Sequence, residues 1–584
     1  MWRPLSVALC ALSLTACASH LPEPASEAGP AGGCRLPVVK LTANQFDDAE
    51  EGASRPLTGR SDEPATLIQS IASRTTVDRY GRPKSVLVLS GGSLHGAFGA
   101  GLFYGWMKSA QSGGEPIPEY DLITGVSTGA LQSTFVFLES SSDEKIRQTA
   151  TEKTEKDRLA TAGFLSHRLG GQENGVDAAG SSYLANLAQD YMPDRESDLL
   201  HLYPLQKVSP NKAGMLELFG HQSVANMEPL RAVIEAELGP RTIEAVGAEA
   251  ARGRKLFVAI ADLVNRYGYA ADLTKLAELA TYPDRQSEQD LNRVFPDWQR
   301  GDRRNLIDAA RQCYIDALVA SSSVPPGVPS VSIEIIKEGR DGHILNPNPH
   351  HRGEPLPTVP SDRVAGQHAF VDGGATFAVF FTQLKSEITE AVNVNMDLIV
   401  NGDYYPKPWA DFVKQPGYKR IRNVKMSAVD IGMQSADLLQ TQVRLFSVQE
   451  ARKWGQDHGR FRWAFIDNNG ITAVEGGVDQ FSHWRGPYAH TPQEWMFTSG
   501  GVPASCREWH KTDAAKFKPM EFYPTYMRCM LNYGMTRGAD PSHRWNLCVP
   551  KDPSLCGRGE AGDFRKSRVD QRPSSSGELT STPG

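Results

Sequence analysis

The chain has 584 residues, a formal net charge of −6 at pH 7 and a sequence pI near 6.2. This length is enough for a large hydrophobic core and for more than one domain. The charge is nearly balanced and no basic patch is interleaved with aromatic residues, so no nucleic-acid partner is expected. The hydrophobic content of 40% and the aromatic content of 8% are typical of a globular enzyme.

The N-terminus has the pattern of a lipoprotein signal peptide. Met1–Arg3 supplies a positive start, and the apolar run Leu5–Leu14 is too short to span a bilayer as a helix. The run leads into LTAC at residues 14–17, which resembles the lipobox of bacterial lipoproteins. In such proteins the peptidase cuts before the cysteine, and the cysteine carries the lipid. We therefore expect residues 1–16 to be removed and Cys17 to be lipidated.

The same resemblance implies a location. Two or three acyl chains on one residue anchor a protein stably, whereas one chain is marginal. An aspartate after the cysteine would suggest retention at the inner membrane, but this position is Ala18. We therefore expect an outer-membrane lipoprotein that faces the periplasm, held through Cys17 and a flexible tether within residues 17–80. The alternative is an ordinary signal peptide in which Cys17 is incidental.

Apolar runs and helical patterns alternate between residues 81 and 405. Continuous apolar runs predict buried strands at residues 85–89, 120–124, 256–261 and 396–400. Apolar or amphipathic stretches predict helices at residues 130–138, 229–238 and 307–318. Such alternation is typical of a mostly parallel sheet with helices on both faces. Insertions are expected near residues 140–220 and 333–367.

A glycine-rich loop, SGGSLHGAFGAG at residues 90–101, follows the first predicted strand. A dinucleotide-binding fingerprint needs a third glycine where Ser93 stands, and a P-loop needs a lysine where Ala97 stands. Neither phosphate-binding motif is therefore matched. A glycine-rich turn before a helix can instead direct backbone N–H groups at an anion. Beside a nucleophilic serine, that anion is the tetrahedral oxyanion of acyl transfer.

The stretch DLITGVSTGALQ at residues 121–132 places Ser127 in a Gly-x-Ser-x-Gly motif with Gly125 and Gly129. A serine on a sharp strand-to-helix turn requires the chain to approach itself closely, and a side chain at either flanking position would clash. The predicted strand before the motif and the predicted helix after it fit this turn. Ser127 is therefore a candidate nucleophile, although such a pentapeptide also arises by chance in a chain with 53 glycines.

The base that would accept the proton of Ser127 has two kinds of candidate. A Ser-Asp/Glu-His order would take a histidine from the C-terminal part of the chain. The candidates there are His458, His483, His490, His510 and His543. The other candidate is Asp372 in AFVDGGA, where two glycines permit a tight turn that exposes the carboxylate at the end of a strand. Asp-Gly alone is also a common turn sequence.

The C-terminal region, residues 406–565, matches no motif. It holds seven of the ten tryptophans, which indicates a packed region, whereas residues 566–584 are expected to be disordered. Six cysteines remain outside the signal peptide and the lipidation site: Cys34, Cys313, Cys506, Cys529, Cys548 and Cys556. An even number in an exported chain predicts disulfides, with fifteen possible pairings. Cys-x-x-Cys is absent, so no metal site is predicted.

Together, the glycine loop, Gly-x-Ser-x-Gly and Asp-Gly-Gly resemble the patatin-like phospholipase family over about residues 84–405. LFVAIADLVNRYGYAADL, from residue 256, and DALVASSSVPP, from residue 316, are similar to further blocks of the family. The resemblance implies a three-layer α/β/α sandwich with a mostly parallel central sheet. It also implies a Ser127–Asp372 dyad without histidine. The family's oxyanion loop corresponds to Gly91, Gly92, Ser93 and Leu94.

Two positions depart from the family pattern. Ser93 stands where a third loop glycine is usual, which would limit how closely the backbone approaches the oxyanion. His95 stands where Arg or Lys is usual, and histidine with an unperturbed pKa of about 6.5 changes charge near neutrality. The side chain of His95 either faces the substrate head group or only packs the loop.

The resemblance implies a lipid acyl hydrolase of phospholipase A or lysophospholipase type that forms an acyl-enzyme on Ser127. Its substrate would be a membrane lipid, and the dyad would need no metal or other cofactor. Burial raises the pKa of a carboxyl group and makes Asp372 a better base. Two alternatives stay open: a Ser-His-Asp carboxylesterase of another α/β class, and a non-catalytic lipid-binding lipoprotein with a degenerate fold. The sequence identifies no protein partner.

Overall fold

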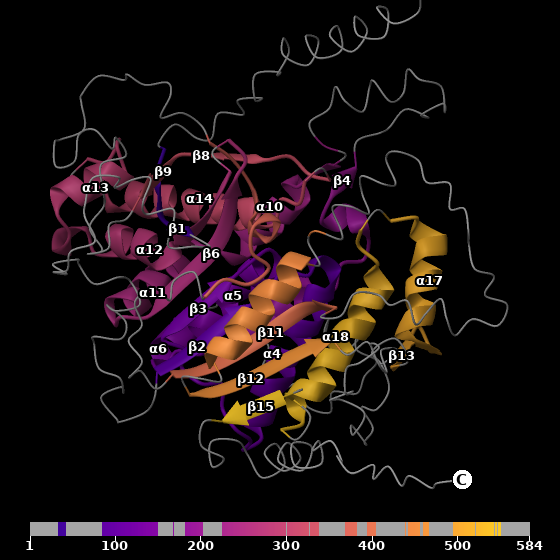
Figure 1. Cartoon of the computed structure of the whole chain (residues 1–584). Coiled ribbons are helices and arrows are strands. Elements are labelled where there is room, and N and C mark those ends of the chain that lie inside the picture. The colour runs from indigo at the N-terminus through magenta and orange to yellow at the C-terminus, as the bar shows by residue number, and fades with distance from the viewer. Residues whose placement is uncertain are drawn as a thin grey trace, which may run out of the picture.

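The computed structural model describes part of the chain (Figure 1). The described residues are 33–41, 84–149, 168, 182–202, 223, 225–264, 266–299, 301–325, 327–337, 368–381, 394–403, 439, 442–455, 459–466, 495–519, 521–541, 544–545 and 547–550. The predicted signal peptide, Cys17 and the predicted tail at residues 566–584 lie outside these ranges. Large parts of the two predicted insertions also lie outside them.

A mixed sheet of eleven strands runs through the described residues. Its centre is a parallel run of β12 (Arg460–Ile466), β11 (Val394–Asp403), β2 (Lys84–Leu89), β3 (Leu122–Gly125) and β6 (Lys255–Asp262). The strands that pair in antiparallel fashion at its borders are β15 (Leu547–Pro550), β7 (Tyr267–Asp272), β1 (Leu36–Leu41), β10 (His368–Asp372) and β8 (Val331–Ile333). The last strand, β9 (Ile335–Lys337), is parallel to β1. The prediction of a mostly parallel central sheet is therefore confirmed.

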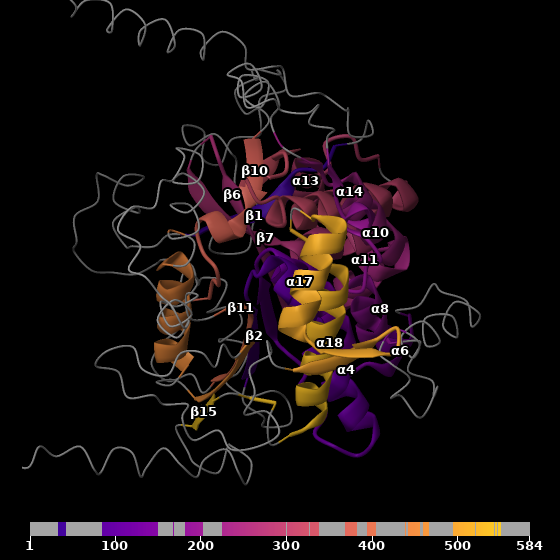
Figure 2. The ribbon, with the colours of Figure 1, turned by 90° about the vertical axis from the view of Figure 1, so that its right-hand side faces the viewer.

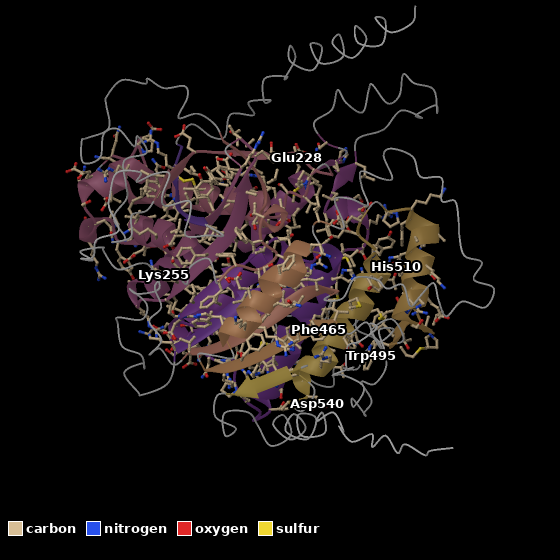
Figure 3. All side chains as sticks on the ribbon, viewed as in Figure 1. Glu228, Lys255, Phe465, Trp495, His510 and Asp540 are labelled. Atoms are coloured by element: carbon tan, nitrogen blue, oxygen red, sulfur yellow. A yellow bond between two sulfur atoms is a disulfide. The ribbon has the colours of Figure 1, made fainter. Side chains whose placement is uncertain are left out.

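Helices cover both faces of the sheet, as the three-layer prediction requires. The first face carries α4 (Gly96–Gln111), α5 (Thr128–Glu139), α14 (Arg303–Ser321) and α18 (Pro524–Ala539), and the second carries a helix at residues 442–455. Figure 2 shows this second helix and α18 on opposite sides of β2 and β11. Side chains fill the space between the layers (Figure 3). Leu87 and Leu89 point into the first core, whereas Val86 and Val88 belong to the second. This alternation explains why the strand is apolar throughout.

The predicted elements coincide with observed ones. The predicted strands correspond to β2, β3, β6 and β11, and the predicted helices correspond to α5, α10 (Glu228–Glu237) and α14. β3 begins at Leu122, two residues later than predicted. Tyr120 lies before the strand but is fully buried, and its hydroxyl donates to Asp397 of β11 at 2.8 Å. The apolar run therefore extends further than the strand pairing.

Helices α4 and α18 pack with their backbones in close contact. A Cβ atom on Gly105 of α4 would lie 2.0 Å from the carbonyl oxygen of Met535, and one on Gly534 of α18 would lie 2.2 Å from that of Phe98. Gly101 and Gly538 make equivalent contacts. Since α18 belongs to residues 406–565, this part of the C-terminal region shares a core with the first strands of the sheet. β12 and β15 also carry the sheet past residue 405.

Two disulfides connect distant parts of the described chain. Cys34 is paired with Cys313, with their Cα atoms 6.2 Å apart, and Cys506 is paired with Cys529, with Cα atoms 5.6 Å apart. The first disulfide joins the start of β1 to α14, and the second joins α17 (Cys506–Phe517) to α18. The prediction of disulfides is confirmed for these four cysteines. Cys556 lies outside the described residues.

The contact between α4 and α18 predicts the effect of adding a single methyl group. Gly105→Ala is expected to lower the free energy of unfolding by about 1–3 kcal/mol, because the new Cβ forces the two backbones apart. Gly33→Ala is the matched control, since a Cβ there meets nothing within 4 Å. The control should stay within about 0.5 kcal/mol of the wild type in urea denaturation. Equal unfolding midpoints for the two variants would contradict the close packing.

Candidate active site

Ser127 lies on a strained turn between β3 and α5. Its backbone has φ 53° and ψ −125°, a conformation that residues other than glycine rarely adopt. A Cβ on Gly125 would lie 2.6 Å from the carbonyl oxygen of Gly129, and a Cβ on Gly129 would lie 2.6 Å from that of Leu89. Both glycines are therefore required by close approach of the backbone, as predicted. The turn displays the hydroxyl at the carboxyl end of the parallel strands.

The pairing of β6 brings Asp372 to this turn. Gly125, the last residue of β3, pairs with Val258 of β6, and Asp372, the last residue of β10, pairs with Ile260. The ends of β3 and β10 therefore meet the same stretch of one strand. The side chain of Ser127 lies near enough to the Asp372 carboxyl to lower its pKa, and Asp372 Oδ1 accepts a hydrogen bond from the Gly374 amide at 2.6 Å.

The environment of Asp372 favours its neutral form. Ser127 is 7% exposed and Asp372 is 4% exposed. Burial raises the pKa of the Asp372 carboxyl to about 7, because a charge is poorly solvated there. The side chain of Ser127 and the hydrogen bond from the Gly374 amide oppose this rise in pKa, and the carboxylate of Glu521 adds to it. The group therefore changes protonation near neutral pH.

The glycine-rich loop lies directly against Ser127. A Cβ on Gly91 would lie 3.1 Å from the Ser127 Cβ, and one on Gly92 would lie 1.9 Å from the carbonyl oxygen of Asn401. The Gly91 amide donates to the carbonyl oxygen of Ala378 at 3.3 Å. Within the part of the chain that the structure describes, no hydrogen bond engages the amides of the next three residues, 92–94. These amides therefore have no acceptor among the described residues.

Ser93 has a partner that the sequence did not indicate. Its backbone has φ 49°, and its Oγ donates to Oε1 of Glu521 at 2.5 Å. Glu521 lies in the C-terminal region, just before α18, and lines the same cavity as Ser93 and Ser127. No motif surrounds Glu521. The only local signal was the serine at position 93, where the family usually has glycine.

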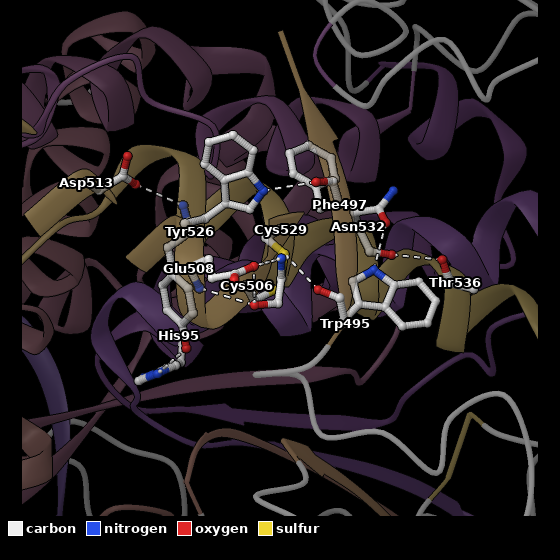
Figure 4. The surroundings of a disulfide bond; sticks show 12 residues. His95, Trp495, Phe497, Cys506, Glu508, Asp513, Tyr526, Cys529, Asn532 and Thr536 are labelled. Atoms are coloured by element: carbon white, nitrogen blue, oxygen red, sulfur yellow. Dashed lines mark hydrogen bonds between the residues drawn. A yellow bond between two sulfur atoms is a disulfide. The ribbon is translucent and has the colours of Figure 1, made fainter. Parts of the chain in front are cut away.

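The histidines considered earlier lie away from Ser127 or outside the described residues. His95 approaches the hydroxyl of Tyr526 on α18 with its Nε2 at 3.3 Å (Figure 4), and it packs the loop onto this helix. It is not among the described residues that line the cavity beside Ser127. His510, on α17, stacks on the ring of Tyr523 with centroids 4.1 Å apart. The four other candidate bases, His458, His483, His490 and His543, are not described.

An apolar cavity opens beside Ser127. It encloses about 960 Å³ of empty space, a figure that includes the open solvent at its mouth. Most of its lining is aliphatic or aromatic, and comes from α5, α8 (Tyr183–Asp190), α10 and α14. Ser93, Ser127 and Glu521 are among its polar lining residues. A hydrocarbon chain fits such a lining, with a polar group left at the serine.

Within the described residues, no group of three or more His, Cys, Asp or Glu side chains is arranged to hold a metal ion. None of the described helices is both long enough and apolar enough to cross a membrane.

A family model described as patatin-like phospholipase matches residues 87–384, which is more than half of the chain. The chain belongs to the patatin-like phospholipase family. Membership indicates lipid acyl hydrolase activity in general, since the members are serine hydrolases. The matched segment includes the glycine loop, Ser127 and Asp372, whereas Glu521 lies outside it. A comparison with curated proteins found no match.

The raised pKa of Asp372 predicts a cost in stability that depends on pH. The folded protein keeps the proton up to pH about 7, whereas the unfolded chain loses it near the ordinary value of 3.8. Stability therefore falls as pH rises between these values. Holding the charge in the folded protein at pH 8 costs about 4 kcal/mol. Asp372→Asn is therefore expected to melt above the wild type at pH 8, and this difference should shrink towards pH 4.

Thermal unfolding at several pH values measures this difference. Asp297→Asn is the control. Asp297 is exposed, so its replacement should change the melting temperature only slightly, and by the same amount at every pH. If the difference in melting temperature between Asp372→Asn and the wild type did not grow with pH, the Asp372 carboxyl group would be ionised without a loss of stability.

Proposed function

We propose that the protein hydrolyses acyl esters of phospholipids or lysophospholipids with a Ser127–Asp372 dyad. The observation that carries this proposal is that Ser127, on its strained turn, and the buried Asp372 meet beside the same stretch of β6, where the Ser127 side chain acts on the pKa of the Asp372 carboxyl. A general base works best when its pKa lies near the working pH, and the pKa of Asp372 is raised to about 7. The adjoining apolar cavity supplies a place for the acyl chain.

The reaction proceeds in two acyl transfers. Asp372 takes the proton of Ser127 as Oγ attacks the ester carbonyl, and the C–O bond to the alcohol then breaks. Asp372 returns the proton to the departing alcohol, which leaves an acyl group on Ser127. A water molecule then attacks this ester while Asp372 takes its proton. The fatty acid departs, and the proton returns to Ser127 Oγ.

The loop at residues 91–94 stabilises the negative charge of both tetrahedral intermediates. Donors that are fixed before the reaction cost no reorganisation when the charge appears, so they lower the barrier efficiently. The amides at residues 92–94 are the suitable donors, because that of Gly91 is already directed to Ala378. Gly91 contributes by allowing the loop to lie against Ser127.

Two observations favour this function over the alternatives. A Ser-His-Asp carboxylesterase would place a histidine beside Ser127, whereas Asp372 is the titratable side chain that Ser127 acts on here, and His510 is stacked on Tyr523. A lipid-binding protein without catalysis would gain nothing from the backbone strain at Ser127. Such strain costs about 1–3 kcal/mol and persists mainly at functional sites.

The dyad predicts that its two members act as one unit. Asp372→Asn should lower kcat/KM about a thousandfold or more, close to the loss in Ser127→Ala, and the double variant should lose little beyond that. In the wild type, kcat/KM should fall as pH drops through about 7, because Asp372 is then protonated. The rates of hydrolysis of a phospholipid and of a soluble ester measure the loss of kcat/KM in the variants and its pH dependence in the wild type. His510→Ala is the control and should keep its activity. Near-normal turnover in Asp372→Asn would show that another group is the base.

We also propose that the protein is exported and anchored through Cys17. The disulfides Cys34–Cys313 and Cys506–Cys529 support an oxidising compartment, because such bonds are rare in the cytosol. Cys17→Ala should move the protein from the membrane fraction to the soluble periplasmic fraction. Cys10→Ala is the control, because Cys10 lies in the segment that is cut off, and it should stay with the membrane. Retention of Cys17→Ala on membranes after a high-salt wash would contradict this anchor.

A further inference from the structure

Ser93 holds a backbone conformation that a serine does not adopt readily. Four residues other than glycine have positive φ within the described chain, and Arg266 and Lys518 occupy the turn between β6 and β7 and the end of α17. The other two, Ser93 and Ser127, both line the cavity of the proposed active site. Left-handed backbone is unfavourable for a residue with a Cβ, so a contact elsewhere must hold Ser93 in place.

Glu521 supplies this contact. Its Oε1 accepts the hydrogen bond from Ser93 Oγ at 2.5 Å. Burial raises the pKa of the Glu521 carboxyl and the hydrogen bond from Ser93 opposes this rise, so the bond stabilises the charged carboxylate and can offset the strain at Ser93. Ser93 begins the short 3-10 helix η1 (Ser93–His95), which leads into α4. The position of its side chain therefore sets the direction of the loop amides.

Glu521 is itself held rigidly with respect to the loop. The amides of Glu521 and Phe522 both donate to Oε1 of the buried Glu196, at 2.6 and 2.9 Å. Two residues later the chain enters α18, whose glycines lie against the backbone of α4. The disulfide Cys506–Cys529 joins α18 to α17 beside the contact between Tyr526 and His95 (Figure 4). The acceptor and the loop thus belong to one packed unit.

We propose that Glu521 is a positioning residue whose hydrogen bond holds Ser93, and with it the oxyanion loop, in the geometry that the reaction needs. A glycine at position 93 would adopt this backbone without help. In this chain Ser93 needs support, and Glu521, which lies outside the family-matched segment, supplies it. The inference rests on the proposed function, and it makes the C-terminal region part of the catalytic machinery.

The test compares the effect of Glu521→Ala in two backgrounds. In the wild type, Glu521→Ala should lower kcat at least about tenfold, which is about 1.4 kcal/mol of transition-state stabilisation, and leave KM within about twofold. In the Ser93→Gly background the same substitution should change kcat by less than about twofold, because a glycine needs no partner. An equal loss of kcat in both backgrounds would overturn the inference.

A second pair of variants separates the hydrogen bond from the charge. Glu521→Gln keeps an acceptor oxygen for Ser93 but removes the negative charge beside Asp372. It should recover most of the kcat that Glu521→Ala loses. A loss as large as that of Glu521→Ala would mean that Glu521 acts through its charge on Asp372, and this would contradict a positioning role.

The loop can also be tested without altering Glu521, should Glu521→Ala fail to fold. Ser93→Ala keeps the Cβ and its strain but removes the hydroxyl, whereas Ser93→Gly removes both. The inference predicts that kcat of Ser93→Ala lies about tenfold below that of Ser93→Gly, and equal values would overturn it.

Ser127→Ala is measured in parallel. Full turnover by Ser127→Ala would reject the proposed function itself, whereas its loss together with equal values at position 93 would reject only the role of Glu521.

Discussion

The contact of Gly129 with the end of β2 is the constraint on which the rest of the site depends. A Cβ at this position would meet the carbonyl oxygens of Leu89 and Ser90, so the first turn of α5 can approach β2 only through a glycine. The chain continues from Ser90 into the glycine loop, and Ser127 lies two residues before Gly129. One backbone contact therefore brings the proposed nucleophile and the loop together, and the close approach of Gly91 to Ser127 follows from it.

The proposed dyad also illustrates a conflict between stability and function. The buried position that would suit Asp372 to act as a base near neutral pH is also one where its charge is poorly solvated. The strained backbone of Ser127 adds a second cost. The surrounding structure offsets both with the extended apolar cores on either side of the sheet and with the direct backbone packing of α4 and α18. The C-terminal region contributes to this packing and reaches into the site through Glu521.

The sequence predicted the parts of the fold and site that have local patterns. Four buried strands were visible as apolar runs, and the need for glycine at positions 125 and 129 followed from the turn around Ser127. Glu521 could not be predicted, because a hydrogen bond across 428 positions leaves no periodicity or motif. The pairing of Cys34 with Cys313 was equally open, since spacing does not determine connectivity. The contact between α4 and α18 did leave a signal, because each helix carries two glycines four residues apart.

The most direct test of the account is to detect the acyl group on Ser127. The protein would be mixed with a fatty-acid nitrophenyl ester, quenched with acid during the first turnovers and analysed by intact-protein and peptide mass spectrometry. The account predicts a mass increase equal to the acyl group on the peptide that contains Ser127, and no increase in Ser127→Ala. Accumulation of the acyl group on a different residue, or continued hydrolysis by Ser127→Ala, would contradict it.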